Sequence, residues 1–328
     1  MFVRLLLALA SLWLAVPATA AGVDAAGLAA LQRLDSRLAE VGNRLAVAAA
    51  GLCADARPLP GFAVHALKQY QPAARAAAAE QFGLGDQPAV LAVVPGSAAE
   101  AAGLRAGDAI LAVDGAAVAP VPAKGRADYA GVAAGEQRIE QALARPPLRL
   151  SVARAGEAVA VAFAPDSGCP TRFQVLASDG LKASADGTYV QISAALIQFA
   201  ESNDELAIVV AHELAHNILR HRETLDAQKV SRGMLAAFGK NRGRIRATER
   251  QADRLAIWLA ARAGYAVAAA PGFWDRFERR VGWGILSDRT HDGRRERVAA
   301  AEAEIAAVAA RWAAGLPLDP PAELRPAQ

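Results

Sequence analysis

The sequence predicts an α+β protein in which a β-rich domain precedes a mainly helical domain that also contains a small β-sheet. Residues 89–118 alternate short apolar runs with Gly-containing turns, which is typical of strands joined by tight connections. Residues 203–219 and 247–265 repeat apolar side chains at helical spacing. Residues 187–193 alternate apolar and polar side chains, which predicts a strand just before the first of these helices.

A chain of 328 residues has room for two domains of ordinary size. We expect a signal peptide over 1–20, an N-terminal helix over 21–58, the β-rich domain over 59–168, the helical domain over 169–316 and a disordered, Pro-rich tail over 317–328. The net charge of +3 is too small to indicate a nucleic-acid partner.

The first residues have the pattern of an export signal. Arg4 precedes an apolar run from Leu5 to Val16, and Ala18-Thr-Ala20 is a small-residue cleavage site. The run is short for a membrane span, and we expect no other span in the mature chain. The high content of Ala, Arg and Gly is typical of a GC-rich bacterium, so we expect a periplasmic protein. A retained N-terminal anchor is the alternative.

The segment after the signal is an expected helix over 24–50, because apolar residues recur three or four positions apart. Cys53 follows it, and Cys169 is the only other cysteine. An even number of cysteines in an exported protein favours a disulfide. This bond would tie the end of the helix to the linker before the helical domain, with two free thiols as the alternative.

Residues 89–118 read AVLAVVPGSAAEAAGLRAGDAILAVDGAAV, which resembles a PDZ domain of bacterial proteases. The resemblance implies a carboxylate-binding loop at Gly83-Leu84-Gly85, a helix flanking a peptide groove at 135–144, and closing strands at 148–153 and 159–163. PDZ domains bind extended peptide C-termini by strand addition, so we expect such peptides as partners. A purely structural β-domain is the alternative.

Residues 212–216 read His-Glu-Leu-Ala-His within a strongly apolar helix. His212 and His216 lie one helical turn apart on one face, where both can bind a single Zn²⁺. Glu213 is placed to take a proton from a water molecule at that metal. The alternative is a buried helix with two hydrogen-bonded histidines, but burying two His and a Glu is costly without a partner or metal.

A third ligand is expected downstream. Glu249 and Asp253 are four residues apart, so one carboxylate can bind the metal while the other supports a ligand histidine. The alternative is a solvated surface face that carries Glu249, Arg250, Asp253 and Arg254. His221 lies five residues after His216, off the ligand face of a continuous helix, and His65 is expected to be structural.

The strings DELAIVVAHELAHN and TERQADRLAIWLAARAGY resemble the gluzincin peptidases, which include the HtpX heat-shock protease, the CAAX prenyl endopeptidase and the periplasmic BepA-type proteases. The resemblance covers residues 175–315 and implies a zincin-type domain with one zinc per chain. It assigns His212, His216 and Glu249 as ligands, Glu213 as the general base and Asp253 as the supporting carboxylate.

The family also carries a His-Pro motif a few residues before an Arg. Here His291 and Arg297 fit that motif, but Asp292 replaces the Pro. The resemblance implies that His291 donates to the oxyanion of the intermediate; an exposed loop histidine is the alternative. It also implies that strand 187–193, or a neighbouring strand, pairs with the substrate backbone as a sheet edge.

These expectations combine into an exported, zinc-dependent endopeptidase that uses metal-activated water in envelope protein quality control or processing. Its substrates would be proteins or peptides, including misfolded envelope proteins. The alternative is a PDZ-based peptide-binding or holdase protein with an inactive metal site. The basic segment 223–246 joins the two metal-binding helices and is either a solvated surface or a flap over the site.

Overall fold

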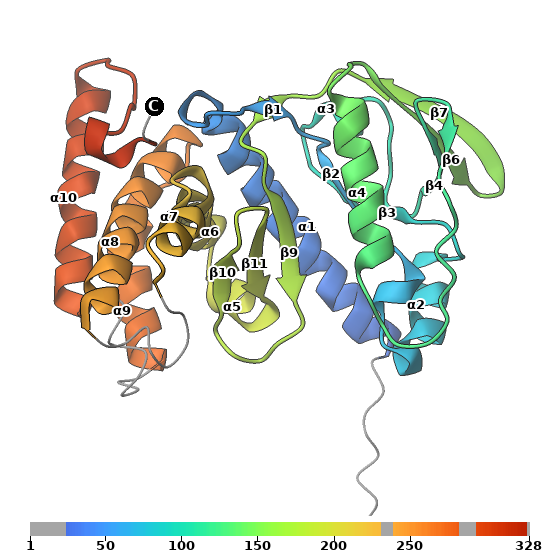
Figure 1. The fold of residues 1–328 in the computed structure, drawn as a ribbon, viewed down its shortest axis with the longest axis horizontal. Coiled ribbons are helices and arrows are strands. Elements are labelled where there is room, and N and C mark those ends of the chain that lie inside the picture. Colours follow the sequence, from blue (N-terminus) through green and yellow to red (C-terminus); the bar gives the residue numbers. More distant parts are fainter. Residues whose placement is uncertain (1–23, 231–238, 282–292, 327–328) are drawn as a thin grey trace, which may run out of the picture.

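The structure, a computed structural model, describes residues 24–230, 239–281 and 293–326. A β-rich half and a mainly helical half lie side by side, and the long helix α1 (Ala25–Ala48) runs between them (Figure 1). This arrangement confirms the α+β class and the order of the two halves.

The β-rich half is built on an antiparallel sheet with strand order β2-β3-β4-β6-β7, to which β5 adds beside β4. Its strands are β2 (Phe62–His65), β3 (Ala89–Val93), β4 (Ala109–Val113), β5 (Ala116–Ala117), β6 (Leu148–Arg154) and β7 (Glu157–Phe163). Its helical elements are η2 (Leu67–Gln69), η3 (Pro72–Ala74), α2 (Arg75–Phe82), α3 (Ala98–Ala101) and α4 (Ala130–Leu143).

Alternation along β6 explains how this sheet forms its core. Leu148, Leu150 and Val152 are buried, whereas Arg149 between them is exposed. Since successive side chains of a strand point to opposite faces, one face of β6 packs into the core. The expected closing strands 148–153 and 159–163 are β6 and β7, and the expected helix 135–144 begins earlier, at Ala130.

The helical half combines a bundle of helices with a three-stranded sheet. Its helical elements are α5 (Ala194–Phe199), α6 (Asn203–Ile218), α7 (His221–Ala227), α8 (Gly239–Arg262), η5 (Val267–Ala269), α9 (Ala270–Val281), α10 (Arg294–Ala313) and η7 (Ala322–Leu324). Its strands are β9 (Arg172–Leu176), β10 (Ala183–Ala185) and β11 (Tyr189–Ser193), in the order β10-β11-β9. Helix α6 packs against both α8 and β10, so the sheet lies beside the most buried helix.

Helix α1 is shared by the two halves and is not a separate N-terminal segment. Leu38, Val41 and Leu45 belong to the core of the helical half, whereas Leu28 packs with Phe82 of the β-rich half. The helix crosses β9 so closely at Gly42 that an added Cβ would lie 2.5 Å from the Phe173 ring.

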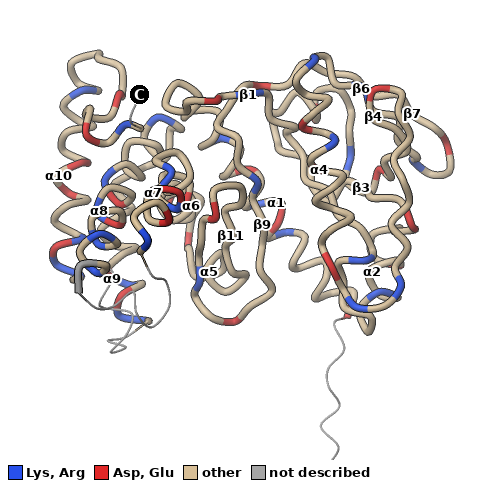
Figure 2. Tube along the Cα trace, viewed as in Figure 1, with Lys and Arg blue, Asp and Glu red and all other residues tan. Residues whose placement is uncertain are grey.

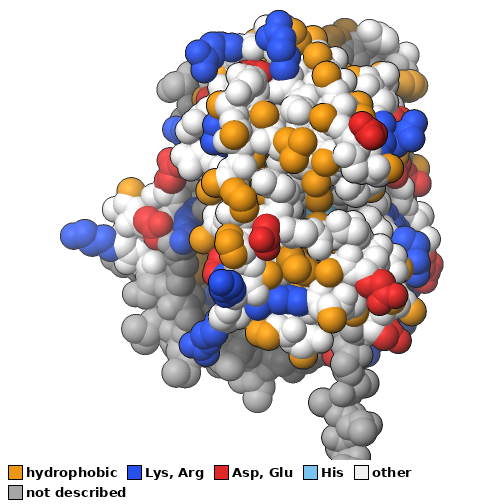
Figure 3. All heavy atoms as spheres, turned by 90° about the vertical axis from the view of Figure 1, so that its right-hand side faces the viewer, with side chains coloured by type: hydrophobic (Ala, Val, Ile, Leu, Met, Phe, Trp, Pro, Cys, Tyr) orange, Lys and Arg blue, Asp and Glu red, His pale blue; other side chains and the backbone are white. Residues whose placement is uncertain are grey.

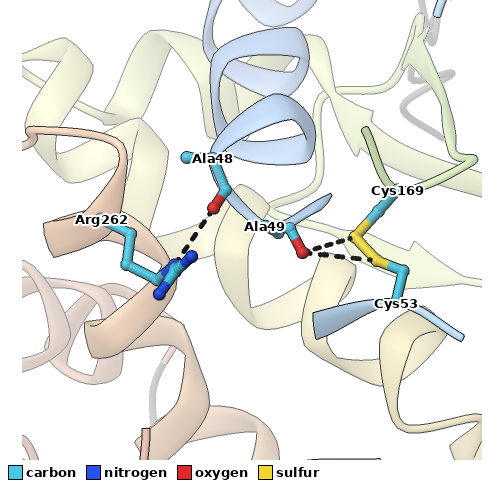
Figure 4. The surroundings of a disulfide bond; sticks show 5 residues. All are labelled: Ala48, Ala49, Cys53, Cys169 and Arg262. Atoms are coloured by element: carbon cyan, nitrogen blue, oxygen red, sulfur yellow. Dashed lines mark hydrogen bonds between the residues drawn. A yellow bond between two sulfur atoms is a disulfide. The ribbon is translucent and has the colours of Figure 1, made fainter. Parts of the chain in front are cut away.

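The expected disulfide joins Cys53 and Cys169, whose Cα atoms are 5.6 Å apart. Both sulfur atoms lie near the Ala49 carbonyl oxygen, and Arg262 of α8 donates to the Ala48 carbonyl at 3.1 Å (Figure 4). Two short strands continue this junction, since β1 (Arg57–Pro58) pairs with β8 (Ser167–Gly168) after the turn η1 (Ala50–Leu52). The end of α1 is therefore held covalently and by the helical bundle.

The chain after Trp312 differs from the expected disordered tail. Residues 317–326 fold back on the bundle: η7 buries Leu324, and Arg262 donates to Asp319 at 2.8 Å. The tail is anchored because Leu318 and Leu324 pack against the core of the helical half and hydrogen bonds join the tail to α8. The expected signal peptide lies outside the described residues, as do 231–238 of the basic segment, whose later part belongs to α8.

Acidic and basic residues occur in both halves of the chain (Figure 2). On the far side of the β-rich half, charges of both signs are interspersed with hydrophobic side chains (Figure 3). Among the described helices, none combines the length and the apolar character that crossing a membrane requires.

Candidate metal centre

Helix α6 positions the central histidines. Its first turn is capped by Ser202, whose hydroxyl accepts a hydrogen bond from the Glu205 backbone at 3.2 Å. From Glu205 to Ala215 every residue of the helix is buried, so the backbone that carries His212 and Glu213 is fixed by packing on all sides.

Three side chains converge on one point between α6 and α8. His212 Nε2 and His216 Nε2 are 3.1 Å apart. Glu249 Oε2 lies 3.3 Å from His212 Nε2 and 3.6 Å from His216 Nε2. Among the described residues, these three form a group whose ligand atoms could hold a metal ion.

The spacing of these atoms fits zinc. With bonds of about 2.0–2.1 Å, neighbouring ligands of a tetrahedral zinc are about 3.3 Å apart, close to the three distances found. Two imidazoles and one carboxylate form a donor set typical of catalytic zinc, and they leave the fourth position open. The residues present therefore fit a zinc ion.

Asp253 supports His212 from behind. Its Oδ1 lies 2.8 Å from His212 Nδ1, which leaves Nε2 directed at the other two ligands. Burial opposes the charged form of His212, but the neighbouring carboxylates of Asp253 and Glu249 outweigh it and raise the pKa to about 10. Such a pKa makes protons compete with a metal for this nitrogen.

Arg297 of α10 completes this support. It donates to both carboxylate oxygens of Asp253, at 2.8 and 2.7 Å, and its Cζ lies 3.5 Å from the centre of the Trp274 ring. Burial would raise the pKa of Asp253, but Arg297 and His212 together hold it well below its usual range. Asp253 is therefore an anion held between two cationic partners.

His221 is a neighbour of the centre that the sequence reasoning missed. Its Nδ1 lies 3.0 Å from His216 Nδ1, and its Nε2 lies 3.1 Å from Gln251 Oε1. Helix α6 ends at Ile218, and Arg220 turns the chain with a positive φ of 52°. The assumption of a continuous helix was therefore wrong, and the break brings His221 back beside the ligand.

The directions of the hydrogen bonds around His221 are consistent with metal binding by His216. Burial lowers the pKa of His221 to about 4, so its ring is neutral near pH 7. His221 Nε2–H then donates to Gln251, and its Nδ1 accepts from His216 Nδ1–H. In a neutral His216 ring, this arrangement leaves Nε2 as the nitrogen without a proton, which is the form that binds zinc.

The remaining expected residues are placed as follows. Glu213 follows His212 in α6 and is buried, with 8% of its surface exposed. His291 lies outside the described residues, so its expected role stays a prediction. His65 is buried in the β-rich half, and its Nδ1 lies 2.9 Å from the Tyr70 hydroxyl, which agrees with a structural role.

The strand expected to bind substrate is in the middle of its sheet. β11 pairs with β10 on one side and β9 on the other, so it offers no free edge. The outer strand beside α6 is its neighbour β10. Asn217, next to His216, accepts a hydrogen bond from the Gly187 backbone at 2.8 Å and fixes the β10–β11 turn to the metal-binding helix.

The glycine loop over residues 83–85, which was expected to bind a peptide carboxylate, does not precede the outer strand that faces α4. Gly83 caps the end of α2 in a left-handed conformation, and residues 83–85 lead into the inner strand β3. The outer strand that faces α4 is β2, and residues 59–61 precede it. Gly61 has a φ of 70°, and an added Cβ would lie 2.9 Å from Ser97, so this turn requires glycine.

Comparison with known proteins agrees with both parts. Residues 90–137 match the PDZ domain model, and residues 150–244, which include the two histidines and Glu213, match the model of peptidase family M48. A Vibrio cholerae protein named as a beta-barrel assembly-enhancing protease is 31% identical over 145 residues. That match covers 35% of this chain and 30% of the relative, so the chain matches less than a third of that protein. The chain thus carries a PDZ domain followed by a metallopeptidase domain of family M48.

Proposed function

We propose that the chain is a zinc-dependent endopeptidase of the gluzincin type. The observation that carries this proposal is the convergence of His212, His216 and Glu249 with separations of 3.1 to 3.6 Å. The three side chains would hold one zinc ion per chain. When bound, Zn²⁺ supplies Lewis-acid chemistry that lowers the pKa of a water molecule and polarises a scissile carbonyl.

The chain's own groups would move the protons and hold the substrate. Glu213 would take a proton from the attacking water and pass it to the leaving amine. His291 would donate to the developing oxyanion, as the resemblance implies.

Substrate would lie along β10 in an extended form. β10 is an outer strand packed against α6, so its free side can add a further strand close to the ligands. Extended binding would present one peptide bond of an unfolded segment to the centre, which favours misfolded proteins as substrates.

The PDZ domain would bind peptide C-termini between β2 and α4. The Gly61 N–H would point at the terminal carboxylate, since Pro60 has no N–H and the Leu59 N–H donates to the Asp166 carbonyl at 2.8 Å. Strand β2 would pair with the peptide. With the expected signal peptide, and with a relative named for β-barrel assembly, these parts support a periplasmic protease of envelope protein quality control or processing.

Metal content and activity test this proposal together. We expect about one zinc per purified full-length chain by mass spectrometry, loss of zinc in His216→Ala, and retained zinc in Glu213→Gln. Hydrolysis of unfolded fluorescent casein should fall by at least about 10³-fold in Glu213→Gln, since the variant lacks the general base. Activity that persists in this variant would refute the mechanism. Protein that stays without zinc under zinc-replete conditions would favour a PDZ-based binding protein.

A further inference from the structure

A pocket lies where the PDZ groove meets the helical half. Phe62 and Val64 of β2 and Ile139 of α4 line one side. Asn43 of α1 and Phe173 of β9 line the other. The groove in which a peptide would bind is therefore bordered on its second side by helix α1, which both halves share, and by β9 of the peptidase half.

The space between these walls is small. The pocket holds about 90 Å³, whereas pockets that bind small ligands hold about 300–1,000 Å³. This volume accommodates a side chain, but an extended peptide backbone beside β2 would need more room. A peptide can therefore enter only if α4 and β9 move apart.

A cluster of polar side chains holds α4 and β9 together, and we name Arg172, Glu136, Glu140 and Tyr189 the latch. Arg172 of β9 donates to Glu140 of α4 at 2.7 Å and lies 3.3 Å from Glu136. The Tyr189 hydroxyl of β11 donates to Glu136 at 2.7 Å. The side chains of Arg172 and Glu136 are each 17% exposed, so their ion pair is largely removed from water.

The latch continues toward the metal-binding helix. Tyr189 is the first residue of β11 and follows the turn in which Gly187 donates to Asn217 at 2.8 Å. The same turn joins β10, along which we place the substrate, to β11. A movement of Tyr189 would therefore shift the substrate strand relative to α6.

We propose that a peptide C-terminus bound between β2 and α4 opens the latch, so that binding at the PDZ groove and the position of the substrate strand are coupled. The inference rests on the proposed peptide binding by the PDZ domain. A closed latch and a bound peptide exclude each other because they compete for the same space. Weakening the latch must therefore strengthen peptide binding, since the coupling between two such states is reciprocal.

The chain offers a matched pair of variants. Tyr189→Phe removes the hydroxyl that links Glu136 to the peptidase half. Tyr129→Phe removes a hydroxyl that donates to the same carboxylate at 3.0 Å from within the PDZ domain. Both substitutions delete one hydrogen bond to Glu136, but only the first crosses between the halves.

Binding would be measured by fluorescence anisotropy with a labelled nine-residue peptide that ends in valine with a free carboxylate. The full-length chain would carry Glu213→Gln so that the probe stays intact, and a peptide with an amidated C-terminus would be the control. We expect Tyr189→Phe to bind about five-fold more tightly, since the latch loses the hydrogen bond from Tyr189 to Glu136 and the one from Arg172 to Tyr189, and Tyr129→Phe to bind as the parent does. Arg172→Ala should bind at least as tightly as Tyr189→Phe.

Three outcomes would overturn the inference in distinguishable ways. Equal affinities in all variants, with the free carboxylate required, would leave peptide binding intact and refute the latch. An equal gain in Tyr129→Phe and Tyr189→Phe would assign the effect to the groove helix alone. Failure of every variant to bind would refute peptide binding itself.

Hydrogen exchange of residues 183–193 provides a second measurement. Saturating peptide should speed exchange in the parent chain, because the turn is released, and should change it little in Tyr189→Phe. Exchange in the parent that does not respond to bound peptide would refute the coupling while leaving the binding site in place.

Discussion

Arg297 donates two hydrogen bonds to Asp253, one to each carboxylate oxygen, from a helix that lies far along the chain from the HExxH motif. Because Asp253 in turn contacts His212 Nδ1 at 2.8 Å, the C-terminal helix α10 takes part in orienting a predicted metal ligand. The metal centre therefore depends on three helices, of which the motif itself supplies one.

Replacement of Arg297 by Leu should damage both stability and metal binding. Its side chain is buried, so the substitution leaves the Asp253 carboxylate without its strongest partner. We expect a loss of about 3–5 kcal/mol in the free energy of unfolding and a zinc affinity lower by about 10–100-fold. Denaturant titration and competition with a chelator measure the two effects. Arg295→Leu, at an exposed position of the same helix, is the control, and equal zinc affinity in Arg297→Leu would contradict the prediction.

Asp35 of α1 should make the protein less stable at alkaline than at acidic pH. Burial raises its pKa to about 7, although the Val175 backbone N–H bonds to the carboxylate and partly offsets this. Below pH 3.8 the carboxyl is neutral in both states, and from pH 3.8 to about 7 only the unfolded chain loses the proton. The contribution of Asp35 to stability therefore falls as pH rises through this window.

Asp35→Asn removes that dependence. At pH 8 we expect the variant to be more stable than the wild type by roughly 2 kcal/mol. This is about half of the free energy that corresponds to the full pKa shift of Asp35, since the half-buried carboxylate still reaches water. Near pH 4 the two proteins should unfold alike. Thermal denaturation across this range measures the difference, and a gap that is independent of pH would contradict the argument.

The sequence predicted most of the site but less of its surroundings. Apolar spacing and the positions of His212, His216 and Glu249 define two helices and their facing sides, because helical periodicity is local. The central place of β11 was not predictable, since alternation marks a strand but not its neighbours in a sheet. The contact between His221 and His216 was not predictable, because it depends on a helix break at Arg220. The position of the peptide groove was not predictable either, because it depends on the order of strands around β2.

Removal of the disulfide should lower stability without removing the metal centre. Cys53 and Cys169 are 116 residues apart, so their bond constrains a long loop in the unfolded chain. The double variant Cys53→Ser, Cys169→Ser should lose about 2–5 kcal/mol of unfolding free energy and keep its zinc. Reductant should destabilise the wild type by a similar amount and leave the double variant unchanged. A wild type that does not respond to reductant after full reduction would contradict this.

His221 is expected to tune the affinity of His216 for zinc. His221 Nδ1 accepts a hydrogen bond from His216 Nδ1, and His221 Nε2 donates one to the Gln251 side-chain oxygen. The Gln251 side-chain amide in turn donates to the Glu323 carbonyl in the C-terminal turn at 2.7 Å. His221→Ala removes the acceptor that orients the ligand ring, so we expect zinc affinity to fall by about 10–100-fold. Gln251→Leu acts only through His221 and should cost less. In the double variant the loss of zinc affinity should equal that of His221→Ala alone, because Gln251 influences His216 only through His221. Chelator competition measures all three affinities, and losses that add would show that Gln251 reaches the metal by another route.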